Sequence, residues 1–277
     1  MQLIEGVKLD IRKSIDKQSV MINNGAIKEI NIENNDVEYL ENSFTPIDKW
    51  IELDEYNKRI LFDNAKNQES FNKIVIDEIP ENIKEILIKL KINESNDRDE
   101  VFSKFAENPE LTLDFENKTT AFLNNFAKSN NSFELYKILV LYPNRKTTAL
   151  LNFNDKTKFL GLHFDSCTTF EIETANESKN RFCINMGSED RELYFVNLSL
   201  VQIKQLILEA NSRENITLKN LTLLFFKYYF NYPITKVKIK PFQFYIAPTD
   251  NCIHEGTTFR KNKIDISITY LGYFNKI

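Results

Sequence analysis

The sequence contains no apolar run that approaches the ~20 residues required for a membrane-spanning helix. Its first residues, Met-Gln-Leu-Ile-Glu, lack the basic and then apolar regions that are typical of a signal peptide. We therefore expect a cytoplasmic protein that has no membrane partner.

Neither sign of charge dominates the chain. Its 36 Lys and Arg residues are scattered among 40 Asp and Glu residues, and the net charge is −4. A surface that binds nucleic acid requires a basic face or stripe. The sequence has no such stripe, so we expect no nucleic-acid partner.

Cysteine is also scarce. Cys167, Cys183 and Cys252 form an odd set without Cys-x-x-Cys spacing, which argues against a disulfide framework. Free thiols are typical of a reducing interior. We interpret the three cysteines as small buried hydrophobic residues.

The chain is rich in apolar and aromatic residues. Its 277 residues are 42% hydrophobic and 12% aromatic, which is enough for a substantial core. Residues 1–130 read as mainly helical after a β-hairpin centred on Asn24-Gly25. We expect this region to pack on the rest of the chain and to provide part of a lid or wall. The expected helices cover residues 48–66, a segment that Pro80 opens, and residues 98–106 and 119–127.

Residues 131–277 have a different pattern. Short segments rich in β-branched and aromatic residues alternate with polar turns and predict many strands. Two helices interrupt them, one after the Ser199 capping box and one over residues 218–230. The pattern favours an α+β fold with a jelly-roll or cupin-like double sheet as its core. The expected strands cover residues 136–142, 159–165, 168–174, 181–186, 192–198, 235–240, 242–247, 252–254 and 265–273.

The chain has just two histidines, and both lie on expected strands. His163 and Asp165 are two residues apart, so their side chains point to the same face of a strand. His254 lies on a later strand of the same β-rich region. Two imidazoles and one carboxylate are the ligand set of the facial triad that holds non-haem Fe(II) and leaves coordination positions open. We predict a metal site formed by His163, Asp165 and His254.

Two segments resemble the Fe(II)/2-oxoglutarate-dependent oxygenases. They are Gly-Leu-His-Phe-Asp at residues 161–165 and Tyr-Ile-Ala-Pro-Thr-Asp-Asn-Cys-Ile-His-Glu-Gly-Thr-Thr at residues 245–258. The resemblance covers roughly residues 139–274 and implies a double-stranded β-helix. It also implies that His163, Asp165 and His254 are the catalytic iron ligands. The implied reaction uses molecular oxygen, decarboxylates 2-oxoglutarate to succinate and hydroxylates an unactivated C–H bond.

The same family requires a cation for the distal carboxylate of 2-oxoglutarate, and arginine is best suited to this role. In many members this arginine follows the second histidine by ten or more residues. The present sequence departs from that pattern, because Asp265 stands near this place. The remaining candidates for the cation are Arg181, Arg260, Lys261 and Lys263.

Two polar residues accompany these cations. Asn185 shares a strand face with Arg181, and the Thr258 hydroxyl offers a further hydrogen bond. We predict that Arg181, Asn185, Thr258 and Arg260 bind the cosubstrate.

Three classes of function stay open. The first is the 2-oxoglutarate-dependent hydroxylase, for which we expect a small substrate that resembles an amino acid or a peptide. The second is a cupin-type metal enzyme that does not use 2-oxoglutarate. The third is a non-catalytic β-sandwich binding module whose histidines are structural.

Overall fold

The computed structural model describes residues 2–12, 20–31, 38–153, 156–166 and 169–277 of the chain. Its α-helices are α1 (Glu55–Phe62), α2 (Glu81–Lys89), α3 (Arg98–Ala106), α4 (Pro109–Asn124), α5 (Leu200–Ala210) and α6 (Leu221–Tyr228). Its strands are β1 (Lys8–Ile11), β2 (Val20–Ile22), β3 (Ala26–Lys28), β4 (Phe44–Pro46), β5 (Ile51–Glu52), β6 (Lys73–Glu78), β7 (Phe133–Leu141), β8 (Leu150–Phe153), β9 (Lys156–Phe159), β10 (Asn180–Asn185), β11 (Arg191–Ser199), β12 (Thr235–Ile239), β13 (Gln243–Ala247), β14 (Cys252–Thr257) and β15 (Asp265–Gly272).

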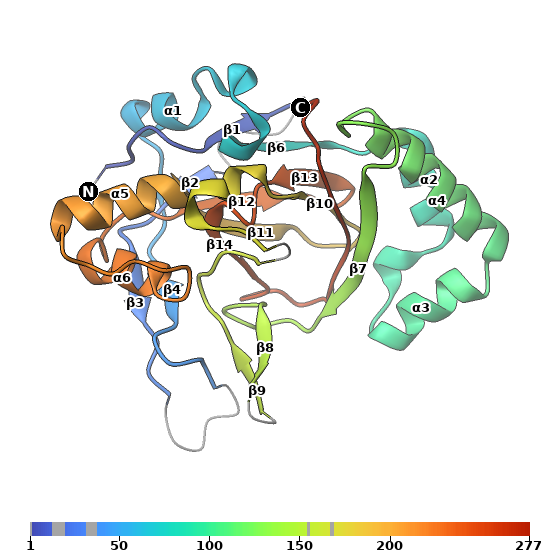
Figure 1. Cartoon of the computed structure of the whole chain (residues 1–277). Coiled ribbons are helices and arrows are strands. Elements are labelled where there is room, and N and C mark those ends of the chain that lie inside the picture. The colour runs from blue at the N-terminus through green and yellow to red at the C-terminus, as the bar shows by residue number, and fades with distance from the viewer. Residues whose placement is uncertain (1, 13–19, 32–37, 154–155, 167–168) are drawn as a thin grey trace.

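Two sheets lie at the centre of the molecule (Figure 1). One sheet has six strands in the order β1-β6-β13-β10-β15-β7, and the other has five in the order β14-β11-β12-β2-β5. Within both sheets every pairing is antiparallel except that of β1 with β6. The prediction of a mixed fold built on strand-rich sheets is confirmed.

The inner faces of the two sheets pack on each other. Cys183 on β10 and Tyr245 on β13 belong to one buried apolar cluster with Leu193, Phe195 and Val237 from β11 and β12. Side chains alternate along a strand, so the neighbours of Cys183 point to the opposite face. This alternation gives the six-stranded sheet a second apolar face, which other elements must cover.

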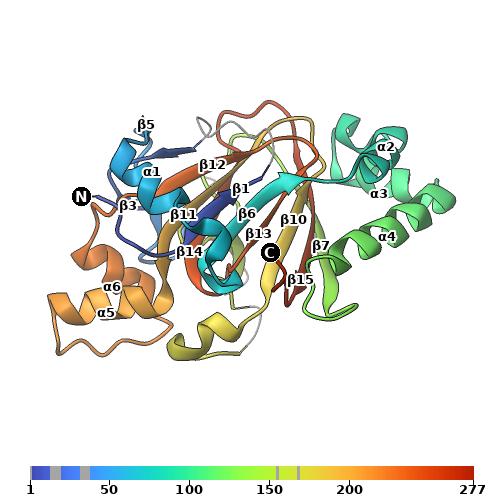
Figure 2. The same cartoon turned by 90° about the horizontal axis from the view of Figure 1, so that it is seen from above.

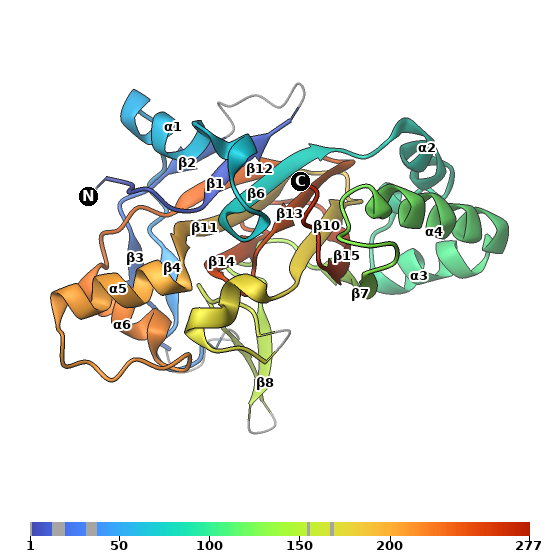
Figure 3. The same ribbon diagram turned by 45° about the horizontal axis from the view of Figure 1, so that its top comes forward.

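Helices α2, α3 and α4 cover that second face (Figures 2 and 3). Phe182 on β10 and Phe244 on β13 stack there with ring centroids 4.5 Å apart. Phe122 of α4 meets the Phe244 ring edge-on at 5.4 Å. Offset and edge-to-face aromatic pairs add to the stabilisation that burial provides. The six-stranded sheet is therefore buried on both faces.

Residues 1–130 contribute strands to both sheets as well as helices. β1 and β6 extend the six-stranded sheet beyond β13, and β2 extends the five-stranded sheet beyond β12. The division of the chain near residue 130 stays a prediction.

Local capping signals set several of the helix boundaries. Ser199 and Gln202 form the expected capping box at the start of α5. Pro80 occupies the N-cap of α2, and α3 covers the predicted residues 98–106. The helix expected at 48–66 begins only at Glu55, because the Asp54 carboxylate accepts a hydrogen bond from the Asn57 amide at 2.7 Å.

The hairpin predicted at Asn24-Gly25 is wrong. β2 pairs with β12 and β5, whereas β3 pairs with β4 in a separate two-stranded sheet. The buried Asn23 side chain redirects the chain, because it donates to the carbonyls of Gly25 and Ile47 and accepts from the amides of Gly25 and Ile234. Gly25, with a φ of 111°, passes against the carbonyl of Phe230, which leaves no room for a side chain.

Two predicted strands are also corrected. Residues 159–165 do not form one strand: β9 ends at Phe159, and Gly161 takes a φ of 68°. The strand expected at 168–174 begins outside the described residues, and Ile172–Glu177 is a 3₁₀ helix. Glu171 and Thr174 form a capping box there, which favours a helical turn over a strand.

Cys183 and Cys252 are free and buried, as expected, and Cys167 lies outside the described residues. Within the described ranges, none of the helices has the length and apolar character needed to span a membrane.

Substituting Asn23 should destabilise the fold. Asn23→Ala removes four hydrogen bonds and leaves the amides of Gly25 and Ile234 without this acceptor, so we expect the free energy of unfolding to fall by about 2 kcal/mol. Urea denaturation followed by circular dichroism measures the change. Asn24→Ala at the neighbouring exposed position is the control, and equal losses in the two variants would contradict the role given to Asn23.

Candidate metal centre

A single β-bridge brings the two histidines together. The His163 amide donates to the His254 carbonyl at 3.1 Å, and the His254 amide donates to the His163 carbonyl at 2.6 Å. His254 lies on β14, and His163 follows the turn at Gly161. That glycine is required, because a Cβ there would lie 2.4 Å from the Phe44 carbonyl oxygen. The Asp165 amide donates a hydrogen bond to the Thr249 carbonyl at 2.9 Å, which fixes the backbone position of this third residue.

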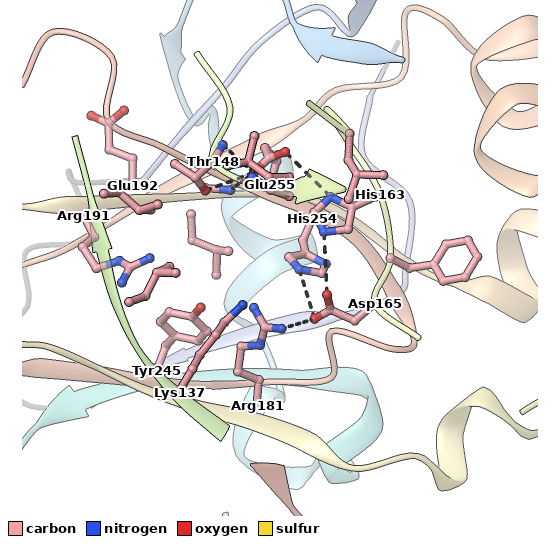
Figure 4. A pocket seen from close by; sticks show the side chains of 18 of the residues that line it. Lys137, Thr148, His163, Asp165, Arg181, Arg191, Glu192, Tyr245, His254 and Glu255 are labelled. Carbon is pink, nitrogen blue, oxygen red and sulfur yellow. Dashed lines mark hydrogen bonds and ion pairs between the residues drawn. The ribbon is translucent and has the colours of Figure 1, made fainter. Parts of the chain in front are cut away.

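The three side chains converge on one point (Figure 4). One potential ligand atom from each of His163, Asp165 and His254 lies within 4.8 Å of the others. Asp165 Oδ1 is 3.7 Å from His163 Nε2, and Asp165 Oδ2 is 3.5 Å from His254 Nε2. These three residues can therefore hold a metal ion between them.

Backbone carbonyls orient both imidazole rings. Nδ1 of His163 lies 2.8 Å from the Gly161 carbonyl, and Nδ1 of His254 lies 3.2 Å from the Cys252 carbonyl. A proton on each Nδ1 satisfies these carbonyls and leaves the Nε2 lone pair for a metal. The Nε2 atoms are the ones that face Asp165.

Burial and neighbouring charges set the protonation of the centre. Burial lowers the pKa of His254 to about 3, so this imidazole is neutral near pH 7. Burial also lowers the pKa of His163, but the neighbouring Asp165 and Glu255 carboxylates outweigh it and raise the pKa overall. Burial opposes ionisation of Asp165, yet Arg181 and the two imidazoles hold its pKa below the usual range.

Arg181 is the counter-ion of Asp165. Its Nη2 lies 2.6 Å from Asp165 Oδ2, and the two side chains are 15% and 14% exposed. Arg181 extends from β10, opposite the bridge that carries the histidines, and its guanidinium lies 5.9 Å from the Tyr136 ring centroid. The sequence placed Arg181 in the cosubstrate site, and the structure places it against the carboxylate of the metal centre.

A cavity of about 430 Å³ adjoins the three residues. Its wall contains the cations Lys137, Arg181 and Arg191 and the hydroxyl-bearing Tyr245. Much of the remaining wall is apolar, and it includes Leu139, Leu141, Leu150, Leu151, Leu160, Phe164, Leu193 and Ile239.

Arg191, which the sequence reading missed, is the buried cation of this cavity. Its Nη2 lies 3.4 Å from Asp265, and its Nη1 donates to Cys183 Sγ at 3.7 Å. Burial opposes its charge, but Asp265 raises its pKa. A signal was present in the sequence, because Asp265 stands near the place where many members of the family that the sequence resembles have arginine, and a buried carboxylate requires a cation. The cation that pairs with Asp265 is Arg191, the first residue of β11 on the facing sheet.

The other predicted cosubstrate residues lie elsewhere. The Asn185 side chain is buried and bonds to the backbone of Glu189, Ile239 and Gly187. The Thr258 hydroxyl donates to the Tyr142 carbonyl at 2.8 Å. Both are occupied in joining segments of the chain, and neither lines the cavity.

The alternative cations at the end of β14 are also remote. Arg260 pairs with Asp48 at 2.9 Å, its side chain is 73% exposed, and it does not line the cavity. Lys261 and Lys263 lie in the same turn and are likewise absent from the cavity wall. Of the four predicted cosubstrate residues, the structure brings only Arg181 to the metal centre.

Comparisons with known proteins give two weak structural likenesses. No family model matches the chain, and no curated protein matches it. The cobalt(II) complex of the Kdo hydroxylase KdoO, described as a non-heme Fe(II) alpha-ketoglutarate-dependent dioxygenase, is 14% identical with a TM-score of 0.40. Its apo structure is 12% identical with a TM-score of 0.39. Each likeness covers 76% of this chain and 82% of the other.

Removing the Arg181 charge should destabilise the metal-free protein. Arg181→Met leaves the Asp165 carboxylate without its cation, so we expect a loss of about 2 kcal/mol, less than for a fully buried pair. Thermal and urea unfolding measure this loss, and added Co(II) should recover part of it by supplying positive charge.

Arg260→Met is the matched control, because it breaks an Arg–Asp pair at the surface. An exposed pair of this kind contributes less than about 1 kcal/mol. Equal losses in the two variants, or no recovery with Co(II), would contradict the role of Arg181 as counter-ion.

Proposed function

We propose that this protein is a non-haem Fe(II)/2-oxoglutarate-dependent oxygenase. The observation that carries the proposal is the convergence of His163, Asp165 and His254, with both Nε2 atoms facing the carboxylate. Two imidazoles and one carboxylate form a donor set that suits Fe(II) and would leave coordination positions open. The chemistry and the orientation of these donors therefore fit the metal.

The order of the strands supports a double-stranded β-helix as the core. From β7 onward, leaving aside the short β8–β9 hairpin and counting the His163 segment, the chain crosses between two sheets at every step except that from β11 to β12, which are neighbours in one sheet. β7, β10, β13 and β15 belong to the six-stranded sheet, whereas β11, β12 and β14 belong to the five-stranded one. The His163 segment joins the second group through its bridge to β14. Eight segments in two facing groups of four match a jelly roll.

When bound, Fe(II) and 2-oxoglutarate would supply the oxidation, in which O₂ is consumed, 2-oxoglutarate becomes succinate and CO₂, and a substrate C–H bond becomes C–OH. The chain's own residues position the reactants. His163, Asp165 and His254 would hold the metal, and the Gly161 and Cys252 carbonyls keep the imidazoles oriented. Arg181 holds Asp165 in place. The apolar part of the cavity wall limits the access of water.

Arg191 is the cation best suited to the distal carboxylate of 2-oxoglutarate. Arg181 is held by Asp165 at 2.6 Å, whereas the contact of Arg191 with Asp265 is longer, at 3.4 Å, and Lys137 is exposed. Arg191 is only 11% exposed and lines the same cavity. A desolvated guanidinium binds a carboxylate more strongly than an exposed one does. The Tyr245 hydroxyl, from the facing sheet, adds a hydrogen-bond donor to this part of the wall.

We expect a small substrate that resembles an amino acid or a peptide. The volume of about 430 Å³ lies in the range of small-molecule sites. Its wall combines cations with leucines, which suits a molecule with both charged and apolar parts. The reaction we propose is hydroxylation of an unactivated C–H bond of that molecule.

Anaerobic titration tests the proposal. The protein with Fe(II) and 2-oxoglutarate should develop the weak visible charge-transfer absorption of a metal chelate. His163→Ala should abolish the band, because it removes one of the three ligands. A folded wild-type protein that binds Fe(II) but gives no band would favour a metal enzyme without 2-oxoglutarate. One that binds no metal would favour a non-catalytic module.

Substituting Arg191 tests the cosubstrate anchor. In Arg191→Met we expect the Kd for 2-oxoglutarate to rise at least about 30-fold, the effect of removing about 2 kcal/mol of a buried charge interaction. Fe(II) affinity should change little, because Arg191 does not touch the ligands. Calorimetric titration in the presence of Co(II) measures both constants.

Asp265→Asn is the matched variant, because it keeps the guanidinium and removes its competing carboxylate. Its affinity for 2-oxoglutarate should equal or exceed that of the wild type. If Arg191→Met binds 2-oxoglutarate normally while remaining folded, the anchor is a different residue.

A further inference from the structure

Glu255 follows the predicted ligand His254, and its side chain is almost completely buried. One carboxylate oxygen, Oε1, accepts four hydrogen bonds: from the amides of Thr148, Ala149 and Gly256 and from the Thr148 hydroxyl, at 2.8 to 3.2 Å. Four donors on one oxygen fix the orientation of the whole carboxylate. Glu255 and Thr148 are among the residues that line the cavity.

The second oxygen, Oε2, has a different environment. It accepts no hydrogen bond from the described residues and is shielded from solvent. It lies 3.7 Å from Nδ1 of His163, toward which it points (Figure 4). Among the ion pairs of the described residues, the partner of Oε2 is the His163 imidazole.

The two histidines differ in whether a carboxylate lies near the Nδ1 atom. Each Nδ1 faces a backbone carbonyl, at Gly161 for His163 and at Cys252 for His254. Among the ion pairs of the described residues, a carboxylate lies near Nδ1 of His163 and none near Nδ1 of His254. Burying an unpaired carboxylate oxygen is costly, so its placement beside one specific ligand requires a physical explanation.

We propose that Glu255 is a positioning residue that strengthens His163 as a metal ligand. Negative charge beside Nδ1–H makes the ring a better donor at Nε2, as outer carboxylates do for other metal-bound histidines. The inference depends on the proposed metal site but not on the use of 2-oxoglutarate. Because Oε1 holds Thr148 and Ala149, the same side chain joins the cavity wall to the metal ligand.

Glu255→Gln separates charge from structure. The amide oxygen can still accept the four wall hydrogen bonds, whereas the NH₂ group replaces the charged oxygen beside His163. We expect Fe(II) and Co(II) to bind about 10- to 100-fold more weakly. Anaerobic competition with a chelator measures the affinity, and the visible spectrum of the Co(II) form reports the changed ligand field. Neither readout requires turnover.

Two controls accompany this variant. Thr148→Val removes one donor to Oε1 and leaves the charge beside His163, so its metal affinity should match the wild type. Glu134→Gln removes an equal charge from the surface, where the Glu134 side chain is 63% exposed, and should also match. Thermal unfolding of the metal-free variants identifies any general loss of structure.

Glu255→Asp covers the case in which Glu255→Gln fails to fold. It keeps the charge but withdraws it from His163, and its metal affinity should lie between those of the wild type and the Gln variant. Wild-type affinity and an unchanged Co(II) spectrum in a folded Glu255 variant would overturn the inference. Weak binding in Thr148→Val equal to that in Glu255→Gln would also overturn it. A wild-type protein without metal affinity would instead refute the proposed function.

Discussion

The candidate site depends on the backbone bridge between His163 and His254. Two amide–carbonyl hydrogen bonds, at 3.1 and 2.6 Å, place the Cα atoms of two residues that are far apart in the sequence next to each other. Because the backbones are adjacent, the two imidazoles converge with little side-chain rotation. The carbonyls of Gly161 and Cys252 further restrict the orientation of the rings. Gly161 makes the bridge possible, since only a residue without a side chain fits against Phe44.

Paired charges are a second organising principle of this region. Arg181 faces Asp165 and Arg191 faces Asp265, and in each pair both partners are largely buried. Such pairs are expensive to desolvate and contribute to stability only when both members are present. They lie between two sheets whose apolar residues fix the spacing, with helices α2, α3 and α4 packed behind one sheet. The aromatic cluster around Phe182 and Phe244 thus supports the wall from which Arg181 extends.

The sequence predicted features that depend on local patterns. The Ser199 capping box, Pro80 at the start of α2 and the alternation along β10 involve neighbouring residues, and the structure confirms them. The alternation of side chains along a strand also predicted that His163 and Asp165 point to the same side of the backbone, although the expected strand is interrupted at Gly161. Predictions failed where distant segments decide the outcome. The hairpin predicted at Asn24-Gly25 does not form, because β2 pairs with β12 instead. Arg191 could not be recognised as a site residue without knowing that β11 brings it next to Asp265.

The ion pair between Arg181 and Asp165 bears on how the proposed site would acquire a metal. In many small metal-binding domains the ion itself drives folding, because the site does not exist in the unfolded chain and the free energy of metal binding stabilises the fold. Here the Arg181 guanidinium already neutralises the Asp165 carboxylate, and burial keeps the His254 imidazole neutral. The polypeptide can therefore complete its fold before loading. Under the proposed function, the metal would therefore be selected at a site that is already folded.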